Sequence, residues 1–379
     1  MAAAENVEEL VIVGGGIAGV AMAVALQRVG KRSLVLERWH ELRESGGPLS
    51  LFPNAWRALD ALGVSHKLKP LYRVIQNGDV TNIETGAKQS QSFAQKQDDG
   101  AEKGARVIHR KALLQAIAEE LTPEAIRFSS KLVSIKTEQL PDSSTVAVLH
   151  LEDRTIIKAK AVIGCDGVHS VVAQWLGLGS PRHSGRSAVR GMAVYTEGHG
   201  FGLQSHQFLS EGTRAGFSPI NKTDVYWGVS HYSTAKEHEM WHDPELIRKA
   251  TLEDLVAEFP AEFKEVVRRS EPESLSWVRL NYRAPWEVLL GRVQRGCITV
   301  AGDAMHPMTP DLGQGGCLAL EDAIVLARCV ARAGTAKEME EGMSRYVAER
   351  RWRAAWVVAA SYFSGFVQQA PGGLWTRPA

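Results

Sequence analysis

The sequence has little cysteine, almost no net charge and no long apolar run. Its four cysteines form no C-x-x-C pair, so we expect reduced thiols in an intracellular protein (Cys165, Cys297, Cys317 and Cys329). Lysine and arginine together number 44 against 43 aspartates and glutamates, so no net field favours nucleic acid. The 12 histidines are scattered without the spacing of metal ligands, and we expect no metal site.

The sequence also shows no pattern typical of a membrane-spanning segment or of an export signal. The apolar run at 354–367 is broken by two serines and a glycine, and it is shorter than the ~20 residues that a spanning helix needs. The first expected strand begins near Glu9, which leaves no room for a leader. We therefore expect no transmembrane segment and a cytoplasmic protein. The aromatic residues of the run are expected to pack on the protein body, with a membrane-surface contact as the alternative.

What the chain does contain is a nucleotide-binding pattern at its start. In 379 residues, long enough for two domains, residues 10–13 predict a buried strand and Gly14-x-Gly16-x-x-Gly19 turns it into a helix. A second strand at 33–37 ends in Glu37, 23 positions after Gly14. This β-α-β unit predicts a dinucleotide site, with the pyrophosphate at the helix start and the carboxylate on a ribose. Because a carboxylate repels a 2′-phosphate, Glu37 favours FAD or NAD over NADP here.

A second turn stands far along the chain, in residues 298–330. The run 298–301 predicts a buried strand that delivers Asp303, and a loop then closes on Gly313-Gln314-Gly315-Gly316 before a helix expected from Cys317. The backbone amides of glycines at the start of a helix can bind an anion. This stretch therefore predicts an anion-binding loop that faces the first turn.

A third strand-to-turn junction, Gly164-Cys165-Asp166-Gly167, follows an expected β-meander at 126–163. Asp166 is interpreted as functional because the arrangement repeats that of Asp303; a simple helix N-cap is the alternative. Residues 180–290 are rich in aromatic residues and alternate as strands, which indicates an inserted antiparallel sheet that covers a cofactor.

Taken together, the three signatures resemble the single-component (class A) FAD-dependent monooxygenases with the para-hydroxybenzoate hydroxylase fold. The likeness is greatest to the plant FAD-dependent monooxygenases, the zeaxanthin epoxidase group and the bacterial FAD-dependent urate hydroxylases. The resemblance implies an α/β fold: a Rossmann-like FAD-binding domain with an inserted antiparallel β-sheet substrate domain and a C-terminal helix. The implied division is FAD-binding segments at 1–70, 106–179 and 291–335, substrate-domain segments at 71–105 and 180–290, and a helical segment at 336–379.

The same resemblance assigns cofactor-binding residues. The turn Gly14, Gly16, Ala18 and Gly19 would hold the FAD pyrophosphate, Glu37 the ribose, and Asp303 the ribityl chain. The remaining implied contacts are Arg38, Ser50, Arg110, the Val133 backbone, Asp166, Pro310, Gly313, Gln314, Gly315, Gly316 and Cys317. Two positions depart from the family pattern: Ala173 stands where an arginine is usual, and Cys317 stands where asparagine is frequent.

The implied activity is hydroxylation of a small aromatic or conjugated molecule with NADPH or NADH and O2, through a flavin C4a-hydroperoxide. Arg214 would orient the substrate, and Tyr226 would steer or deprotonate it. The alternatives are a hairpin-tip charge for Arg214 and a packed strand aromatic for Tyr226. Two other functions stay open: a flavoprotein oxidoreductase or cyclase without oxygen insertion, and a catalytically silent flavin-binding regulatory protein. We expect no nucleic-acid partner, and a monomer or homodimer.

Overall fold

The computed structural model describes residues 7–42, 46–93, 104–139, 145–234, 237 and 243–369. The polar loop expected at 96–104 lies outside these residues except for Gly104.

One sheet is built from the parallel strands that the nucleotide-binding pattern predicts. Its order is β16 (Gln294–Arg295), β17 (Ile298–Val300), β10 (Ile156–Gly164), β1 (Val7–Val13), β2 (Leu34–Leu36) and β7 (Ile126–Arg127), and β9 (Thr145–Leu151) and β8 (Leu132–Gln139) extend it from β10. Strands β17, β10, β1, β2 and β7 run parallel to one another. Their carboxyl ends therefore meet at one edge, where ligands of open α/β sheets bind.

Helices cover this sheet. Helices α1 (Ile17–Arg28) and α9 (Gly315–Val330) pack against each other and against the strands through their buried apolar residues. The other helices are α2 (Pro53–Leu62), α3 (Ser65–Leu68), α4 (Arg110–Ala118), α5 (Val171–Trp175) and α8 (Pro285–Leu290), and β3 (Leu49–Leu51) pairs with β6 (Arg106–Ile108). Single 3₁₀ turns span Pro123–Ala125, Pro272–Ser274, Gly302–Ala304 and Pro310–Leu312.

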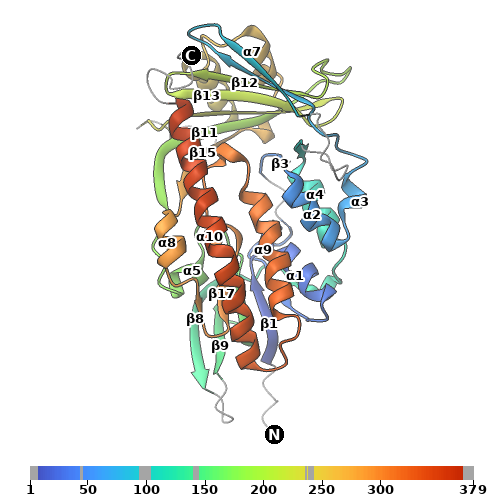
Figure 1. Cartoon of the computed structure of the whole chain (residues 1–379), viewed down its shortest axis with the longest axis vertical. Helices are drawn as coiled ribbons and strands as arrows, with labels where there is room; N and C mark the ends of the chain where they lie inside the picture. The colour runs from blue at the N-terminus through green and yellow to red at the C-terminus, as the bar shows by residue number, and fades with distance from the viewer. Residues whose placement is uncertain are drawn as a thin grey trace.

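A second sheet lies above the first (Figure 1), in the order β15 (Ser276–Tyr282), β11 (Arg182–Val194), β14 (Asp224–Tyr232), β13 (Thr213–Pro219), β12 (Gln204–Ser210), β4 (Asn77–Asn82) and β5 (Lys88–Ser92). The expectation of an antiparallel sheet needs one correction, because β4 pairs with β12 in parallel. The β4–β5 hairpin comes from a separate part of the chain, so its direction is not set by a hairpin connection to β12.

The second sheet has its own core. Helices α6 (Pro244–Ala250) and α7 (Ala261–Arg268), with the π-helical turn Thr251–Leu255 between them, pack on one face of the sheet around Trp227 and Phe263. The 34-residue helix α10 (Ala336–Gln369) runs from the lower sheet to the upper one (Figure 1). Among the described residues, no helix combines the length and the apolar character needed to cross a membrane.

Candidate functional site

Four loops converge where the parallel strands end. Val13 is in register with both Leu36 and Gly164, and Gly164 is in register with Val300. The turns that follow these strands carry Gly14, Glu37, Asp166 and Asp303, so the three stretches singled out in the sequence are neighbours in the fold.

Two glycines allow these turns to touch. Gly14 has φ +105°, and a Cβ there would lie 2.5 Å from the carbonyl oxygen of Cys165. Gly302 has φ +57°, and a Cβ there would lie 2.9 Å from the Cβ of Ala18. Any larger residue would separate or strain the turns, because its Cβ would clash and because a positive φ is unfavourable for a residue with a Cβ. The first and last signatures are thus in direct contact through Ala18.

Glu37 is buried at the end of β2, and both of its carboxylate oxygens accept backbone hydrogen bonds. Oε2 accepts from the amide of Gly15 at 2.6 Å, and Oε1 accepts from the amide of Trp39 at 2.9 Å. These bonds fix the carboxylate against the glycine turn. The exposed Arg38 guanidinium lies 5.4 Å from the centre of the Trp39 ring.

The glycine-rich loop leads into α9, which begins at Gly315 and not at Cys317 as the apolar pattern suggested. The first backbone amides of a helix have no hydrogen-bond partner within the helix, so they are available to an anion. At such a site glycine is suitable despite its low helix propensity, because it leaves these amides accessible. A Cβ at Gly315 would have its nearest neighbours at 3.9 Å (Met308 Cγ) and 4.0 Å (Asp303 Oδ1). The surface above this helix start is therefore open, and the exposed Asp303 borders it.

Cys317 and Gln314 support the loop from inside. The Cys317 thiol is buried, 3.7 Å from the carbonyl oxygens of Ser50 and Gly313, and burial raises its pKa to about 11. It stays protonated at neutral pH and serves as a small packed side chain. The side-chain oxygen of Gln314 accepts a hydrogen bond from Asn54 at 3.1 Å.

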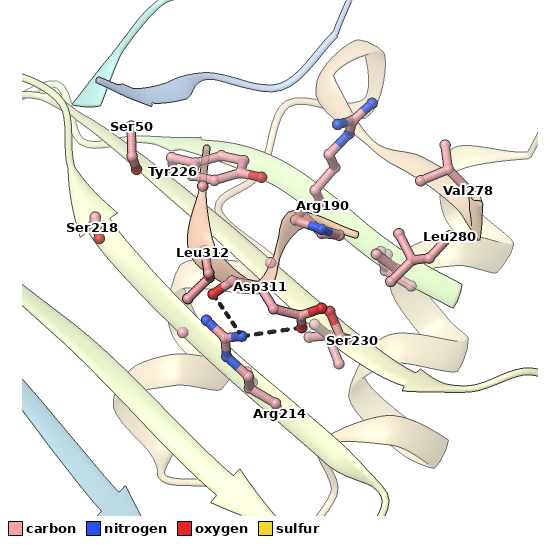
Figure 2. A pocket seen from close by; sticks show the side chains of 18 of the residues that line it. Ser50, Arg190, Arg214, Ser218, Tyr226, Ser230, Val278, Leu280, Asp311 and Leu312 are labelled. Carbon is pink, nitrogen blue, oxygen red and sulfur yellow. Dashed lines mark hydrogen bonds and ion pairs between the residues drawn. The ribbon is translucent and has the colours of Figure 1, made fainter. Parts of the chain in front are cut away.

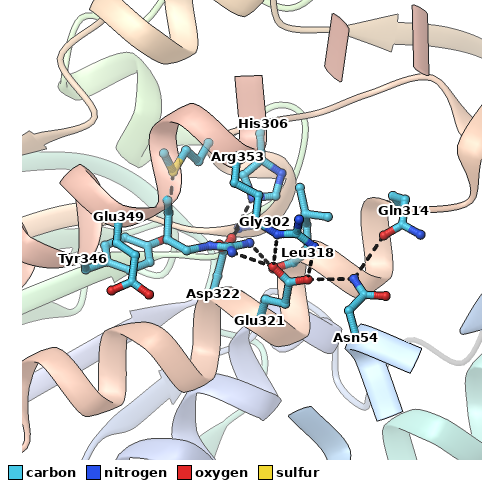
Figure 3. A network of polar contacts seen from close by, with 12 residues as sticks. Asn54, Gly302, His306, Gln314, Leu318, Glu321, Asp322, Tyr346, Glu349 and Arg353 are labelled. Carbon is cyan, nitrogen blue, oxygen red and sulfur yellow. Dashed lines mark hydrogen bonds and ion pairs between the residues drawn. The ribbon is translucent and has the colours of Figure 1, made fainter. Parts of the chain in front are cut away.

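Below the loop lies a buried ionic network (Figure 3). Asp322 accepts hydrogen bonds from the amide of Gly302 at 2.9 Å, from His306 at 2.6 Å and from Arg350 of α10 at 2.6 Å. Burial alone would raise the pKa of Asp322, but His306 and Arg350 lower it to about 2. The carboxylate thus holds the turn that presents Asp303.

Three predicted residues have structural partners or lie apart from this loop. Asp166 caps α5, because its Oδ2 accepts from the amide of Val171 at 2.7 Å and its Oδ1 from the Ser170 hydroxyl at 2.5 Å. Val133 lies on β8 with 53% of its surface exposed. Arg110 begins α4, and its side chain lies against Gly46.

A cavity of about 640 Å³ separates the two sheets beside the glycine-rich loop. Of the predicted residues, it is lined by Ser50, Asp303, Pro310, Gly313, Arg214 and Tyr226. Figure 2 shows Arg190 and Tyr226 above the Asp311-Leu312 turn and Arg214 below it.

Arg214 is anchored by a buried aspartate. Its guanidinium lies 3.3 Å from Asp311 Oδ1, while Arg186 binds both oxygens of the same carboxylate at 3.0 and 2.8 Å. Arg186 also donates to Gln369, the last described residue of α10, at 2.7 Å. Because Arg186 already matches the charge of Asp311, the charge of Arg214 remains available to the cavity.

Tyr226 lies on β14 with its hydroxyl in the cavity. Burial raises its pKa, although Arg190 opposes the shift. A raised pKa keeps the hydroxyl protonated at neutral pH, which suits a hydrogen-bond donor and disfavours the role of a base.

Sequence reasoning missed the residues whose partners are distant in the chain: Arg186, Arg190, Asp311, His306, Asp322 and Arg350. His306, Asp311 and Asp322 lie inside the stretch 298–330 that the sequence singled out, but no role was predicted for them. Arg186 and Arg190 stand at even spacing on one expected strand, a signal that they share a face. Within the described ranges, no group of three or more His, Cys, Asp or Glu could hold a metal ion.

Comparisons with known proteins agree with this geometry. Residues 7–361 match the family described as FAD binding domain. Monooxygenase 2 of Arabidopsis thaliana is 39% identical over 97% of this chain and 91% of its own length. The aurachin C monooxygenase/isomerase of Stigmatella aurantiaca is 31% identical over 95% of this chain and 89% of its own. The crystal structure of Klebsiella pneumoniae HpxO with FAD and uric acid superposes with a TM-score of 0.83, at 21% identity, over 96% of this chain and 90% of that one.

The chain therefore belongs to the FAD binding domain family, and its α/β fold is that of the structurally characterised members. It is an FAD-dependent monooxygenase that uses NAD(P)H as reductant. The site suits FAD, because the glycine turn, the exposed Asp303 and the open start of α9 lie along one edge of the sheet.

Proposed function

We propose that this protein hydroxylates a small aromatic or conjugated molecule bound in the cavity between the start of α9 and the upper sheet. The observation that carries the proposal is that the cavity is lined at once by the glycine-rich loop and by Arg214 and Tyr226 of the upper sheet. A molecule there would lie beside the ring system of a cofactor held by that loop. The relatives named monooxygenases and a relative named 3-hydroxybenzoate 6-hydroxylase, 27% identical, support this reaction type.

The proposed cofactor contacts follow from the same edge of the sheet. The turn Gly14, Gly16, Ala18 and Gly19 would face the pyrophosphate, Glu37 and Arg38 the adenosine end, and Asp303 the ribityl chain. Ser50, Arg110, Val133, Asp166, Pro310, Gly313, Gln314, Gly315, Gly316 and Cys317 complete the proposed set. The first amides of α9 would stabilise negative charge on the reduced ring, since oriented backbone dipoles need no reorganisation.

The reaction consumes one O2, one NAD(P)H and one proton, and it yields hydroxylated substrate, NAD(P)+ and water. Bound FAD supplies the electron transfer and the activation of oxygen. The residues of this chain position the substrate and exclude water. We propose that Arg214 orients a carbonyl or anionic group and that the protonated Tyr226 steers the substrate by donating a hydrogen bond.

We also propose the domain division at 70/71, 105/106, 179/180, 290/291 and 335/336; the presence of two separate cores supports two domains, while Tyr72, Ile75 and Val288 pack in the first core from segments assigned to the second domain. A cytoplasmic location and a monomeric or homodimeric state are proposed with it. The balanced charge of the sequence, 44 basic against 43 acidic residues, gives no support for a nucleic-acid partner.

The test is coupled turnover. Purified FAD-loaded protein is mixed with NADPH or NADH and a panel of phenols and aromatic acids, and both NAD(P)H oxidation and product mass are followed. We expect at least one compound to accelerate oxidation and to gain a single oxygen atom. Oxidation without a mass gain would instead identify an oxidoreductase or cyclase, and bound flavin that no nicotinamide reduces would identify a silent flavin protein.

Two variants localise the activity. Arg214→Gln should raise KM more than it lowers kcat, because its role is to bind. Tyr226→Phe should lower kcat/KM by about tenfold, the typical value of one hydrogen bond to a polar group at ~1.5 kcal/mol. Wild-type kinetics in both variants would contradict the proposed placement of substrate.

A further inference from the structure

The upper sheet offers a substrate slot with a floor that lacks side chains. Arg190 of β11 is in register with Gly228 of β14, and Gly228 is in register with Gly216 of β13. All three line the cavity. Residues in one cross-strand row point to the same side, and neither glycine places a side chain there. The Cβ position of Gly228 has no neighbour closer than 3.7 Å, whereas that of Gly216 lies 2.7 Å from the carbonyl oxygen of His206.

The neighbouring rows form the walls of this slot. On one side stand Tyr226 and Ser218, which are paired with each other, and on the other side stand Ser230 and Arg214, which are also paired. Rows on the same face are about 6.8 Å apart along a strand, so the two wall rows are about 13.6 Å apart and the glycine row lies midway between them. The slot therefore fits a flat molecule lying over Gly228 and Gly216.

Two hydrogen-bond donors converge at one end of the floor. The Tyr226 hydroxyl lies 3.8 Å from the position that a Cβ of Gly228 would occupy, and the positive charge of Arg190 is near enough to lower the pKa of that hydroxyl. The Arg190 Nε donates to the Ser276 hydroxyl at 3.0 Å, which fixes the plane of the guanidinium. Its Cδ and Nε lie 3.0 and 3.4 Å from the position of a Cβ on Gly47, so the side chain is also held from the other side.

The charge of Arg190 is not balanced by the protein. In the described part of the chain, Arg190 forms no ion pair, and its Nε donates a hydrogen bond to the neutral hydroxyl of Ser276. Of the two aspartates that line the cavity, Asp311 is paired with Arg186 and Arg214, and among the described residues Asp303 forms no ion pair with Arg190. A partly buried guanidinium with only neutral partners favours an anionic ligand.

We propose that Arg190 is a specificity-determining residue, which together with the Tyr226 hydroxyl binds the carboxylate of an aromatic acid lying over the Gly228–Gly216 floor. Arg214 stays tethered to Asp311 at the far wall and contacts the opposite end of the molecule. The inference rests on the proposed function, because it concerns the substrate of the same cavity.

The test measures binding without turnover. Oxidised FAD-loaded protein is titrated with 3-hydroxybenzoate and with the uncharged 3-hydroxybenzamide, and the perturbation of the flavin absorbance gives each Kd. We expect the acid to bind the wild type at least about tenfold more tightly than the amide, as for one charge-assisted hydrogen bond. Arg190→Gln should remove most of this preference and leave amide binding within about twofold, and Arg190→Lys should retain part of it, because a lysine keeps the charge but lacks the planar fork.

Three further variants complete the test. Ser276→Ala keeps the charge but releases the guanidinium plane, and it should weaken acid binding only. Gly228→Ala adds a methyl group at ordinary contact distance, 3.7 Å from the Val189 carbonyl oxygen, and it should weaken both compounds because it fills the floor. Arg182→Gln, on the same strand but exposed and paired with Glu287, is the matched control and should bind both compounds as the wild type does.

The outcomes separate this inference from the proposed function. Acid and amide bound equally by the wild type, unchanged acid preference in Arg190→Gln, or no binding of the acid at millimolar concentration would each overturn the inference. Arg190-dependent acid binding with no oxygen gained in turnover would sustain the inference and refute the proposed hydroxylation. Hydroxylation of neutral compounds at a rate that Arg190→Gln does not change would sustain the proposed hydroxylation and refute the inference.

Discussion

Two aspartates at the edge where the parallel strands end have different roles. Asp303 is exposed at the cavity, and no hydrogen bond to its side chain is found among the described residues, whereas Asp322 directly behind it is buried and bound by three donors. The first is therefore suited to bind a ligand, and the second to hold the turn. The two aspartates predict opposite responses to substitution.

Asp303→Ala should weaken FAD binding and leave the fold intact. Loss of a hydrogen bond to a charged group costs about 1.5–3 kcal/mol, so the Kd should rise roughly tenfold to a hundredfold. Fluorescence titration of FAD into the flavin-free protein measures it. Asp254→Ala, an exposed aspartate of the upper domain, is the control; equal FAD affinity in the two variants would remove Asp303 from the site.

Asp322 should give the protein a stability that depends on acid pH. Its pKa is about 2 in the folded protein, below the ~3.9 of an unfolded aspartate. A lowered folded pKa stabilises the fold above pH ~4, and this stabilisation, about 2 kcal/mol, is lost as pH falls toward 2. Denaturant unfolding of the wild type at pH 6, 4 and 3 should show the decline. Asp322→Asn should be less stable by about 3–5 kcal/mol at pH 6, because His306 and Arg350 lose the buried charge that they share and Arg350 keeps only Glu321 as an ion-pair partner, and its slope with pH should be smaller.

At the level of elements, the start of α9 is an exposed helix end that is available for a ligand. Gly315→Ala should leave the thermal stability of the flavin-free protein unchanged or slightly raised, since nothing lies within 3.9 Å of the added methyl group and alanine favours a helix. The same methyl group would occupy the space of the cofactor, so FAD affinity should fall by about tenfold or more, as for a clash in a packed site.

The matched control is Gly179→Ala, at a glycine whose added Cβ would also meet only an ordinary contact, Glu287 Oε2 at 3.8 Å. It should change neither stability nor FAD affinity. Gly302→Ala should differ from both and lower stability itself, because φ is +57° and Ala18 stands 2.9 Å from the new atom. Normal FAD binding by Gly315→Ala would show that the loop does not receive the cofactor.

The same elements show how much of the site can be predicted from the sequence. Glycine turns and the acidic residues after strands predicted the cofactor edge, because strand, turn and helix start are encoded within about 20 consecutive residues. The residues that form the walls of the cavity could not be predicted from local sequence patterns. Arg190 meets Tyr226 only through strand register, and Asp311 meets Arg186 across 125 positions. The parallel pairing of β4 with β12 was missed for the same reason, since register between distant strands is set by tertiary packing.

On the scale of the whole molecule, two cores are joined through one buried charge cluster. Asp311 belongs to the turn just before Gly313, Arg186 to the upper sheet, and Gln369 to the end of α10, and they meet with side chains that are almost fully buried. Gln369 also donates to the carbonyl oxygen of Ser230 at 2.7 Å. The cluster therefore fixes the glycine-rich loop relative to the substrate wall.

Asp311→Asn should disrupt both functions of this junction. Removing one charge leaves the buried Arg186 uncompensated, which costs about 3–5 kcal/mol in unfolding free energy. FAD affinity should fall as well, because the loop that ends at Gly313 loses its anchor to β11. By contrast, Arg182→Gln breaks the exposed ion pair between Arg182 of β11 and Glu287. Because 52% of the arginine side chain is accessible, this change should lower the unfolding free energy by less than about 1 kcal/mol. Denaturant unfolding with and without FAD measures both terms; an Asp311→Asn protein as stable as Arg182→Gln would show that the Asp311–Arg186 ion pair does not hold the two domains together.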